Sequence, residues 1–258
     1  MRIVIKIGTS TLTHPTGLLH IKRVEELCKT VSDLKNAGNE VIVVSSGAIG
    51  MGAGKLFLSE KPSDIPTKQA AAAVGQCELM YTYDKLFSEY NHTVAQILIT
   101  GEDTRHPERR RNFENTVKRL LELNVIPIIN ENDSVATEEL VIGDNDTLSA
   151  IVSTLVGADL LILLSDINGL YTADPHKDEK ARLLKRVDEI TPEIESMTGG
   201  AGSRLGTGGM ATKVAAAKIA MDAGINMVIA NGSEPAILYD IVDGKEVGTL
   251  FIAKGKNK

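Results

Sequence analysis

The chain has very few aromatic side chains and no tryptophan: four Phe and five Tyr make up 3% of its 258 residues. Its hydrophobic core must therefore be built from Val, Ile, Leu and Ala, which suits a parallel sheet covered by helices. Cysteine is equally scarce, since Cys28 and Cys77 are the only two and neither has a CxxC partner. This pattern excludes a disulfide framework and a cysteine-based zinc site, and it is typical of free thiols in a reducing compartment.

Long apolar runs are also missing. No stretch could span a bilayer, and the N-terminal apolar run is too short for a signal peptide. The formal net charge of -6 argues against a nucleic-acid-binding surface. Metal-ligand spacing is absent, and no His has a Ser or Cys partner by pattern, so a His-based triad is unsupported. We therefore expect a soluble, cytoplasmic protein with no membrane and no nucleic-acid partner.

Strand and helix signals alternate from one end of the chain to the other. The expected strands are the apolar runs 3–7, 41–44, 94–99, 125–129, 160–164, 227–230 and 247–252. The expected helices have apolar residues at helical spacing and cover 21–35, 69–90, 111–123, 147–156 and 210–223. This rhythm predicts an α/β fold, a three-layer αβα sandwich around a mostly parallel sheet. No linker or shift in composition interrupts it, so we expect residues 1–258 to form one domain.

Two polar clusters follow the strand expected at 125–129: Asn130-Glu131-Asn132-Asp133 and Gly143-Asp144-Asn145-Asp146. Acids grouped so closely repel one another, so we expect a cation or a ligand amine among them. The alternative is two turns rich in Asp and Asn. Parallel strands bring their carboxyl ends to one edge of a sheet, where α/β folds bind ligands. Other expected strands end in small or polar residues at the same edge, and these are Lys6-Ile7-Gly8-Thr9-Ser10, Ser45-Ser46-Gly47-Ala48, Ser165-Asp166 and Asn231-Gly232.

A glycine-rich segment, 206–213, leads into the helix expected at 210–223. Its backbone N–H groups, the helix N-terminus and Lys213 suit a phosphate, although the spacing matches neither Walker A nor GxGxxG. The alternative is a flexible loop. Lys6 lies inside an apolar run and is costly to bury unless it is paired. We therefore expect a partnered Lys6 that faces a ligand, the alternative being an edge strand with Lys6 in solvent.

Taken together and in order, these segments resemble the glutamate 5-kinases of the amino-acid kinase superfamily. The match covers essentially the whole chain, and the Asn-Glu-Asn-Asp and Gly-Asp-Asn-Asp segments are its most specific parts. The resemblance implies ATP-dependent phosphorylation of the side-chain carboxylate of L-glutamate, the first step of proline biosynthesis. Many members carry a C-terminal PUA domain. Because the sequence stops at Lys258, we expect that domain to be missing.

The resemblance also implies roles for particular residues. Lys6 and Lys213 would stabilise the transferring phosphoryl group, and Asp146 would hold both lysines in place. Ser46, Asp133 and Asn145 would bind glutamate, with Asp133 suited to the substrate ammonium. The nucleotide site would comprise Lys6, Ser165, Asp166, Thr207, Gly208, Gly209, Met210, Ala211, Thr212 and Lys213.

Cofactor and partners follow from the same resemblance. Mg²⁺ would accompany ATP, with Asp144 as a candidate ligand. Proline would act as a feedback inhibitor that competes with glutamate, the chain would form a homo-oligomer, and it would be linked functionally to glutamyl-phosphate reductase.

Three alternatives stay open. A superfamily relative such as acetylglutamate or aspartate kinase is the nearest, but an acid at Asp133 suits a free amine rather than an acetylated nitrogen. A non-catalytic amino-acid sensor would not need Lys6, Asp146 and Lys213. A Rossmann protein binding NAD or a nucleotide sugar would carry GxGxxG after the first strand, where this chain has Gly8-Thr9-Ser10.

Overall fold

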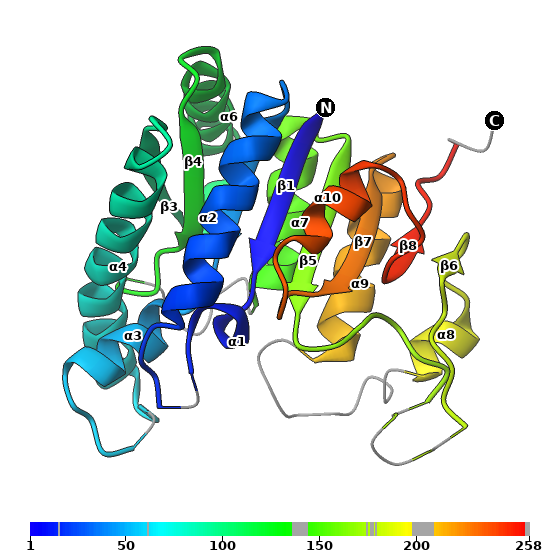
Figure 1. Ribbon diagram of the computed structural model, residues 1–258, viewed down its shortest axis with the longest axis horizontal. Helices are drawn as coiled ribbons and strands as arrows, with labels where there is room; N and C mark the ends of the chain where they lie inside the picture. The colour runs from blue at the N-terminus through cyan, green and yellow to red at the C-terminus, as the bar shows by residue number, and fades with distance from the viewer. Residues whose placement is uncertain are drawn as a thin grey trace.

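The computed structural model describes residues 1–14, 16–60, 62–135, 144–173, 175, 178, 180–197 and 209–255. Its centre is an eight-stranded sheet in the order β3-β4-β2-β1-β5-β7-β8-β6 (Figure 1). The strands are β1 (Arg2–Ile7), β2 (Glu40–Ser45), β3 (Val94–Ile99), β4 (Ile126–Glu131), β5 (Leu160–Ser165), β6 (Arg186–Val187), β7 (Asn226–Asn231) and β8 (Thr249–Phe251). All pairings are parallel except that of β7 with β8, so the expected mostly parallel sheet is confirmed.

Helices cover both faces of this sheet. They are α1 (Thr9–Leu12), α2 (Ile21–Asn36), α3 (Ala48–Lys55), α4 (Ile65–Ser88), α5 (Gly101–Arg105), α6 (Pro107–Glu122), α7 (Asn145–Val156), α8 (Pro192–Met197), α9 (Met210–Asp222) and α10 (Ile237–Val242). Apolar side chains of α2, α4 and α10 pack on one face, and those of α6, α7 and α9 pack on the other. The three-layer αβα sandwich is therefore confirmed (Figure 1).

The alternation of side chains along β1 decides where Lys6 points. Ile3, Ile5 and Ile7 belong to the core under α2 and α4, whereas Val4 belongs to the core under α7 and α9. Because successive strand residues face opposite sides, Lys6 lies on the same face as Val4. β1 is a central strand between β2 and β5, so the edge-strand alternative for Lys6 is wrong.

Two glycines bring α3 and α4 into backbone contact. A Cβ on Gly52 would overlap the carbonyl oxygen of Ala71, and one on Gly75 would overlap that of Ala48. Only glycine allows two helices to approach this closely. The contact fixes the first turn of α3 beside the middle of α4, at the carboxyl edge of the sheet.

Several elements differ from the sequence-based expectation. Helix α4 begins at Ile65 rather than at residue 69, because Asp64 caps it by accepting from the Thr67 N–H at 2.9 Å and Pro66 suits its first turn. Strand β4 continues through Asn130 and Glu131, which are buried rather than in a loop. The glycine-rich α3 and the short α1, α5, α8, α10 and β6 were not expected.

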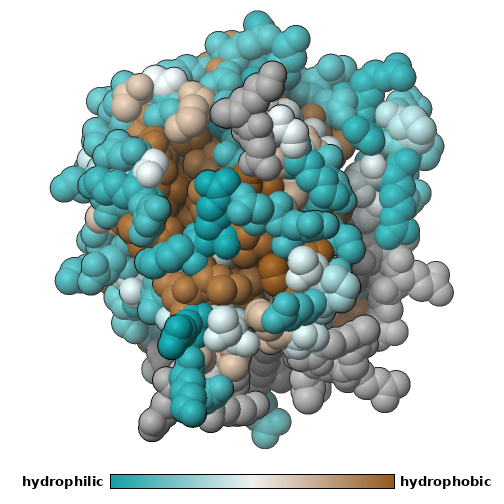
Figure 2. Space-filling view, turned by 90° about the vertical axis from the view of Figure 1, so that its right-hand side faces the viewer, coloured by the Kyte–Doolittle hydropathy of each residue, from teal (hydrophilic) through white to brown (hydrophobic). Residues whose placement is uncertain are grey.

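The end of the sheet that carries β6 and β8 presents a mixed surface. Figure 2 views the molecule from this side and shows apolar side chains in the middle of the face, bordered by hydrophilic ones. Partly buried Leu184, Ile190 and Ile194 from this region pack against the core. In the described part of the chain, no helix combines the length and the hydropathy that crossing a membrane requires.

Candidate active site

Three charged side chains meet in the interior at the carboxyl edge of the sheet. The Nζ atom of Lys6 lies 2.8 Å from Asp146 Oδ1, and the Nζ atom of Lys213 lies 3.0 Å from Asp146 Oδ2. Lys6 comes from β1, Asp146 from the first turn of α7 and Lys213 from α9. All three are buried, at 6%, 0% and 3% exposed. A buried charge must be paired, and here one carboxylate pairs with both ammonium groups.

The electrostatics of this Lys6–Asp146–Lys213 cluster keep the carboxylate ionised. Burial alone would raise the pKa of Asp146, but the two neighbouring ammonium groups outweigh burial and hold that pKa below its ordinary value. Thr212 adds a hydrogen bond, since its hydroxyl donates to Asp146 Oδ2 at 2.9 Å. Asp146 is thus an anchor for cations, not a proton acceptor.

The start of α7 places Asp146 in this position. Asp144 caps the helix, because one carboxylate oxygen accepts from the Thr147 N–H at 2.8 Å and the other from the Thr147 hydroxyl at 2.9 Å. With the cap fixed, the next two residues, Asn145 and Asp146, form the first turn and point towards the ends of the central strands.

A chain of side-chain amides extends away from the charged cluster. The Nδ2 group of Asn145 donates to the Ser45 carbonyl at 3.1 Å, the Ser46 hydroxyl at 2.9 Å and Asn130 Oδ1 at 2.9 Å. The Nδ2 group of Asn130 donates to Gln76 Oε1 at 2.9 Å. This amide relay therefore joins the ends of β2 and β4 to α7 and α4. Among the described residues, no hydrogen bond uses the side-chain Oδ1 atom of Asn145 or the hydroxyl proton of Ser46, so both are available to a ligand.

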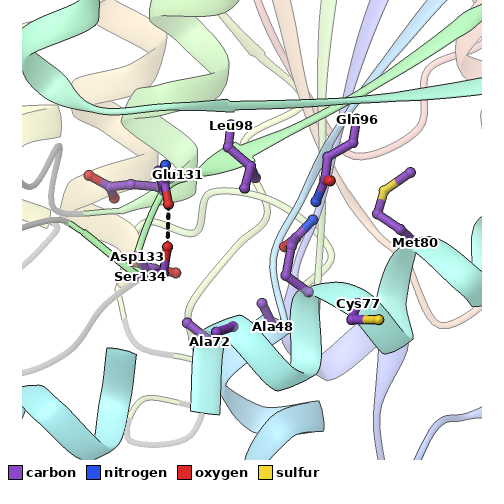
Figure 3. A pocket seen from close by; sticks show the side chains of 12 residues that line it. Ala48, Ala72, Cys77, Met80, Gln96, Leu98, Glu131, Asp133 and Ser134 are labelled. Atoms are coloured by element: carbon purple, nitrogen blue, oxygen red, sulfur yellow. Dashed lines mark hydrogen bonds between the residues drawn. The ribbon is translucent and has the colours of Figure 1, made fainter. Parts of the chain in front are cut away.

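A cavity of about 430 Å³ lies at the α4 end of the relay (Figure 3). Gln96 and Leu98 of β3 face Ala72 and Cys77 of α4 across it, and Asp133 lies at one side. The lining residues are Ala48, Ala72, Ala73, Gln76, Cys77, Met80, Gln96, Leu98, Glu131, Asn132, Asp133 and Ser134. Burial raises the pKa of the Asp133 carboxyl group, so a cation in the cavity would be favourable. The Ser134 hydroxyl donates to Asn132 Oδ1 at 2.6 Å and shapes this turn (Figure 3).

The expected nucleotide residues lie on the other side of β1. Ser165 ends β5, where its hydroxyl donates to Asp166 Oδ1 at 3.1 Å. Gly209 is the N-cap of α9, and Met210, Ala211, Thr212 and Lys213 form its first turn. Thr207 and Gly208 lie outside the described residues. In the sheet order, β2 and β4 lie on one side of β1 and β5 and β7 on the other, so the charged cluster separates the two groups of expected residues.

The structure brings together most residues singled out in the sequence, adds Gln76, and gives Asn130 and Thr212 contacts that the sequence did not predict. Ser46 and Asn145 are hydrogen-bonded to each other, and Asp133 lines the cavity beyond them. Asn130 was visible in the sequence as part of a polar run, although its part in the relay was not. Thr212 was expected only as a nucleotide residue. Gln76 gave no signal, because a single Gln in an alanine-rich helix reads as a surface residue.

This chain is similar to known proteins in both sequence and fold. A family model described as "Amino acid kinase family" matches residues 1–231. A protein named Glutamate 5-kinase from Clostridium perfringens is 55% identical over 257 residues, covering 98% of this chain and 96% of that protein. A protein of the same name from Clostridium tetani is 58% identical over 251 residues, covering 97% of this chain and 94% of that protein. Another from Carboxydothermus hydrogenoformans is 55% identical over 258 residues, covering all of this chain but 69% of the relative.

Solved structures share the fold at much lower identity. A carbamate kinase from Giardia lamblia superposes with a TM-score of 0.68 at 17% identity, covering 98% of both chains. A UMP kinase from Bacillus anthracis gives 0.65 at 17% identity, covering 98% of this chain and 96% of that one. The family model matches most of this chain, and the relatives named above are more than half identical to this chain. This chain belongs to the amino acid kinase family.

Proposed function

We propose that this chain transfers a phosphoryl group from ATP to the side-chain carboxylate of L-glutamate and forms L-glutamyl 5-phosphate, in the first step of proline biosynthesis. The observation that carries the proposal is the buried Lys6–Asp146–Lys213 cluster, in a chain about half identical over nearly its whole length to proteins named Glutamate 5-kinase. The identity points to the acceptor, and the cluster supplies groups for the chemistry.

The chemistry needs charge stabilisation rather than a base. A glutamate carboxylate is already an anion, so one of its oxygens can attack the γ-phosphorus directly while the bond to the leaving ADP oxygen breaks. Negative charge develops on the phosphoryl oxygens and on the leaving oxygen between two anionic reactants. The ammonium groups of Lys6 and Lys213 can counter this charge in a buried site. Asp146, kept ionised, holds both ammonium groups in place before the reaction.

The acceptor and the nucleotide would occupy opposite sides of β1. On one side, the Ser46 hydroxyl and the side-chain oxygen of Asn145 are suited to hydrogen bonds with glutamate, and the Asp133 carboxylate is suited to the ammonium group of glutamate. On the other side, Ser165, Asp166 and the first turn of α9 would contact the nucleotide, together with residues 207–208. The reacting groups would then meet at the charged cluster.

Magnesium would enter with the nucleotide. The described residues hold no group of three or more His, Cys, Asp or Glu side chains that could bind a metal. Both oxygens of Asp144 are used in capping α7, and both oxygens of Asp146 are paired with lysines. Mg²⁺ in such enzymes is bound mainly through phosphates with few protein ligands, which fits this site. When bound, it would neutralise phosphate charge.

One assay separates this function from its nearest alternatives. ATP turnover should be measured with L-glutamate, N-acetylglutamate, aspartate and UMP, with hydroxylamine present to trap any acyl phosphate as a hydroxamate. We expect hydroxamate from L-glutamate alone. Turnover of N-acetylglutamate in preference to glutamate would contradict the role of Asp133, and no ATP turnover with any acceptor would favour a sensor.

Regulation and assembly extend the proposal. Proline shares an α-carboxylate and a cationic nitrogen with glutamate and lacks the reacting carboxylate, so one pocket can accept either molecule but phosphorylate only glutamate. Homo-oligomer formation and a link to glutamyl-phosphate reductase stay predictions from the family resemblance.

A further inference from the structure

The side chain of Gln76 ends in an unsatisfied donor. Its Nε2 atom is buried and has no hydrogen-bond acceptor among the described residues. Gln76 is 7% exposed and lines the cavity between α4 and β3. A buried donor without a partner is costly and rare in folded proteins, so such a group calls for an explanation.

The backbone fixes which end of the Gln76 amide is unsatisfied. The N–H of Glu131 can only donate, and it donates to Asn130 Oδ1 at 2.9 Å. The amide of Asn130 must therefore turn its Nδ2 group towards Gln76, whose Oε1 accepts at 2.9 Å. Turning the Gln76 amide over would place two NH₂ groups against each other. The orientation is thus dictated by the network, and Nε2 is the end left without a partner.

The relay also places this donor relative to the reacting groups. Asn130 Oδ1 accepts from Asn145, and Asn145 is followed by Asp146, which pairs with both lysines. Gln76 is therefore at the opposite end of the relay from the charged cluster. Asp133, the acid suited to an ammonium, lines the same cavity as Gln76.

We propose that Gln76 Nε2 donates a hydrogen bond to the α-carboxylate of the amino-acid substrate, whose ammonium faces Asp133. This inference rests on the proposed function and adds a specificity residue to it. The γ-carboxylate must reach the lysines, so the group left at the other end of glutamate is the α-carbon with its ammonium and carboxylate. An acid and an N–H donor on one cavity are the complementary pair for these two groups.

The test uses Gln76→Glu. The carboxylate introduced by Gln76→Glu keeps an oxygen for the Nδ2 group of Asn130 and replaces the donor with a second oxygen, so the relay can persist while the contact with the substrate is lost. We expect KM for L-glutamate to rise about 10- to 100-fold, the range for a hydrogen bond to a charged group, with kcat and KM for ATP within about twofold of wild type. Gln76→Met, which removes the donor without adding charge, should raise KM in the same direction and serves if the first variant does not fold.

Gln69→Glu is the matched control. Gln69 lies on the same helix α4, two turns before Gln76, and is not among the residues that line the cavity, so this variant makes the same chemical change outside the site. Its KM for glutamate should stay within about twofold of wild type. An equal rise in both Glu variants would mean that added negative charge alone explains the effect, and the inference would fail.

A substrate analogue identifies the contacted group. The compound 4-aminobutanoate keeps the amine and the reacting carboxylate but lacks the α-carboxylate, so its inhibition constant should be the same for wild type and the uncharged variant Gln76→Met. An inhibition constant that rises as much as KM for glutamate, or a fall in kcat at constant KM, would overturn the inference. Wild-type protein that does not phosphorylate glutamate would refute the proposed function instead, which separates the two failures.

Discussion

Asp146 pairs with two buried cations, so replacing it should lower the free energy of unfolding. A second substitution, which removes one of the cations, should restore part of that loss. Asp146→Asn keeps the shape of the side chain but removes the carboxylate that pairs with both buried ammonium groups. Breaking a buried ion pair costs about 3–5 kcal/mol, a large share of a typical folding free energy. The two Nζ–oxygen distances, 2.8 and 3.0 Å, are nearly equal, so each lysine should carry a similar part of the loss.

Removing one cation in the asparagine background tests this reasoning. In the double variant Asp146→Asn/Lys213→Met, one of the two ammonium groups that lost the Asp146 carboxylate is gone. We expect it to regain about 1–3 kcal/mol relative to Asp146→Asn, which is within the range of coupling energies between contacting residues. The free energy of unfolding should be measured by urea denaturation with circular dichroism, because the chain has no tryptophan to report fluorescence. Losses that simply add would show that the charges are not coupled.

The same carboxylate predicts a dependence of stability on pH. The folded-state pKa of Asp146 is lowered, so its contribution to stability is present above its ordinary pKa of about 3.9 and is lost as the pH falls through the folded value. The free energy of unfolding of the wild type should therefore fall more steeply than that of Asp146→Asn below about pH 4. Parallel pH profiles would contradict the assignment.

Three further predictions concern activity. Lys6→Met and Lys213→Met should each lower kcat by about 10² or more with little change in KM for glutamate, as stopped assays at saturating ATP would show; near-normal kcat in both would remove the lysines from the chemistry. Because burial raises the pKa of Asp133, KM for glutamate should rise as the pH falls through that raised value, and Asp133→Asn should show a high KM with no such acid limb while ATP binding stays intact. Proline should raise the apparent KM for glutamate and leave kcat unchanged in a glutamate–proline grid of initial rates; a pure kcat effect would place it at a separate site.

The layers of the fold could be predicted from the sequence because strand and helix periods are local. Val and Ile runs such as 41–44 are buried on both faces and read as central strands whatever surrounds them. The pairing of β7 with β8 in the antiparallel sense could not be predicted, since direction depends on the path of a connecting segment. Helix α3 was missed because its glycines lower helix propensity, and only packing against α4 explains them.

The candidate site was predictable in its parts and not in its connections. Lys6 had to be paired because it interrupts an apolar run, but periodicity alone could not name Asp146 as its partner; that assignment came from a family resemblance. Gln76 lies more than 50 residues before Asn130, and their hydrogen bond follows only from the packing of α4 beside β4. Such long-range polar contacts leave no periodic trace in a sequence.

The glycine contact between α3 and α4 has a consequence for how this enzyme's specificity could evolve. Where backbones touch, no side chain is available to change rotamer and absorb a displacement, so the part of the cavity wall that α3 and α4 form is stiff. Ala48 and Gln76 must then move together or not at all. A new acceptor would be accommodated more readily by exchanging side chains that point into the cavity than by shifting its wall. Variation in acceptor choice should therefore be concentrated in a few cavity-facing positions, while Gly52 and Gly75 stay unchanged.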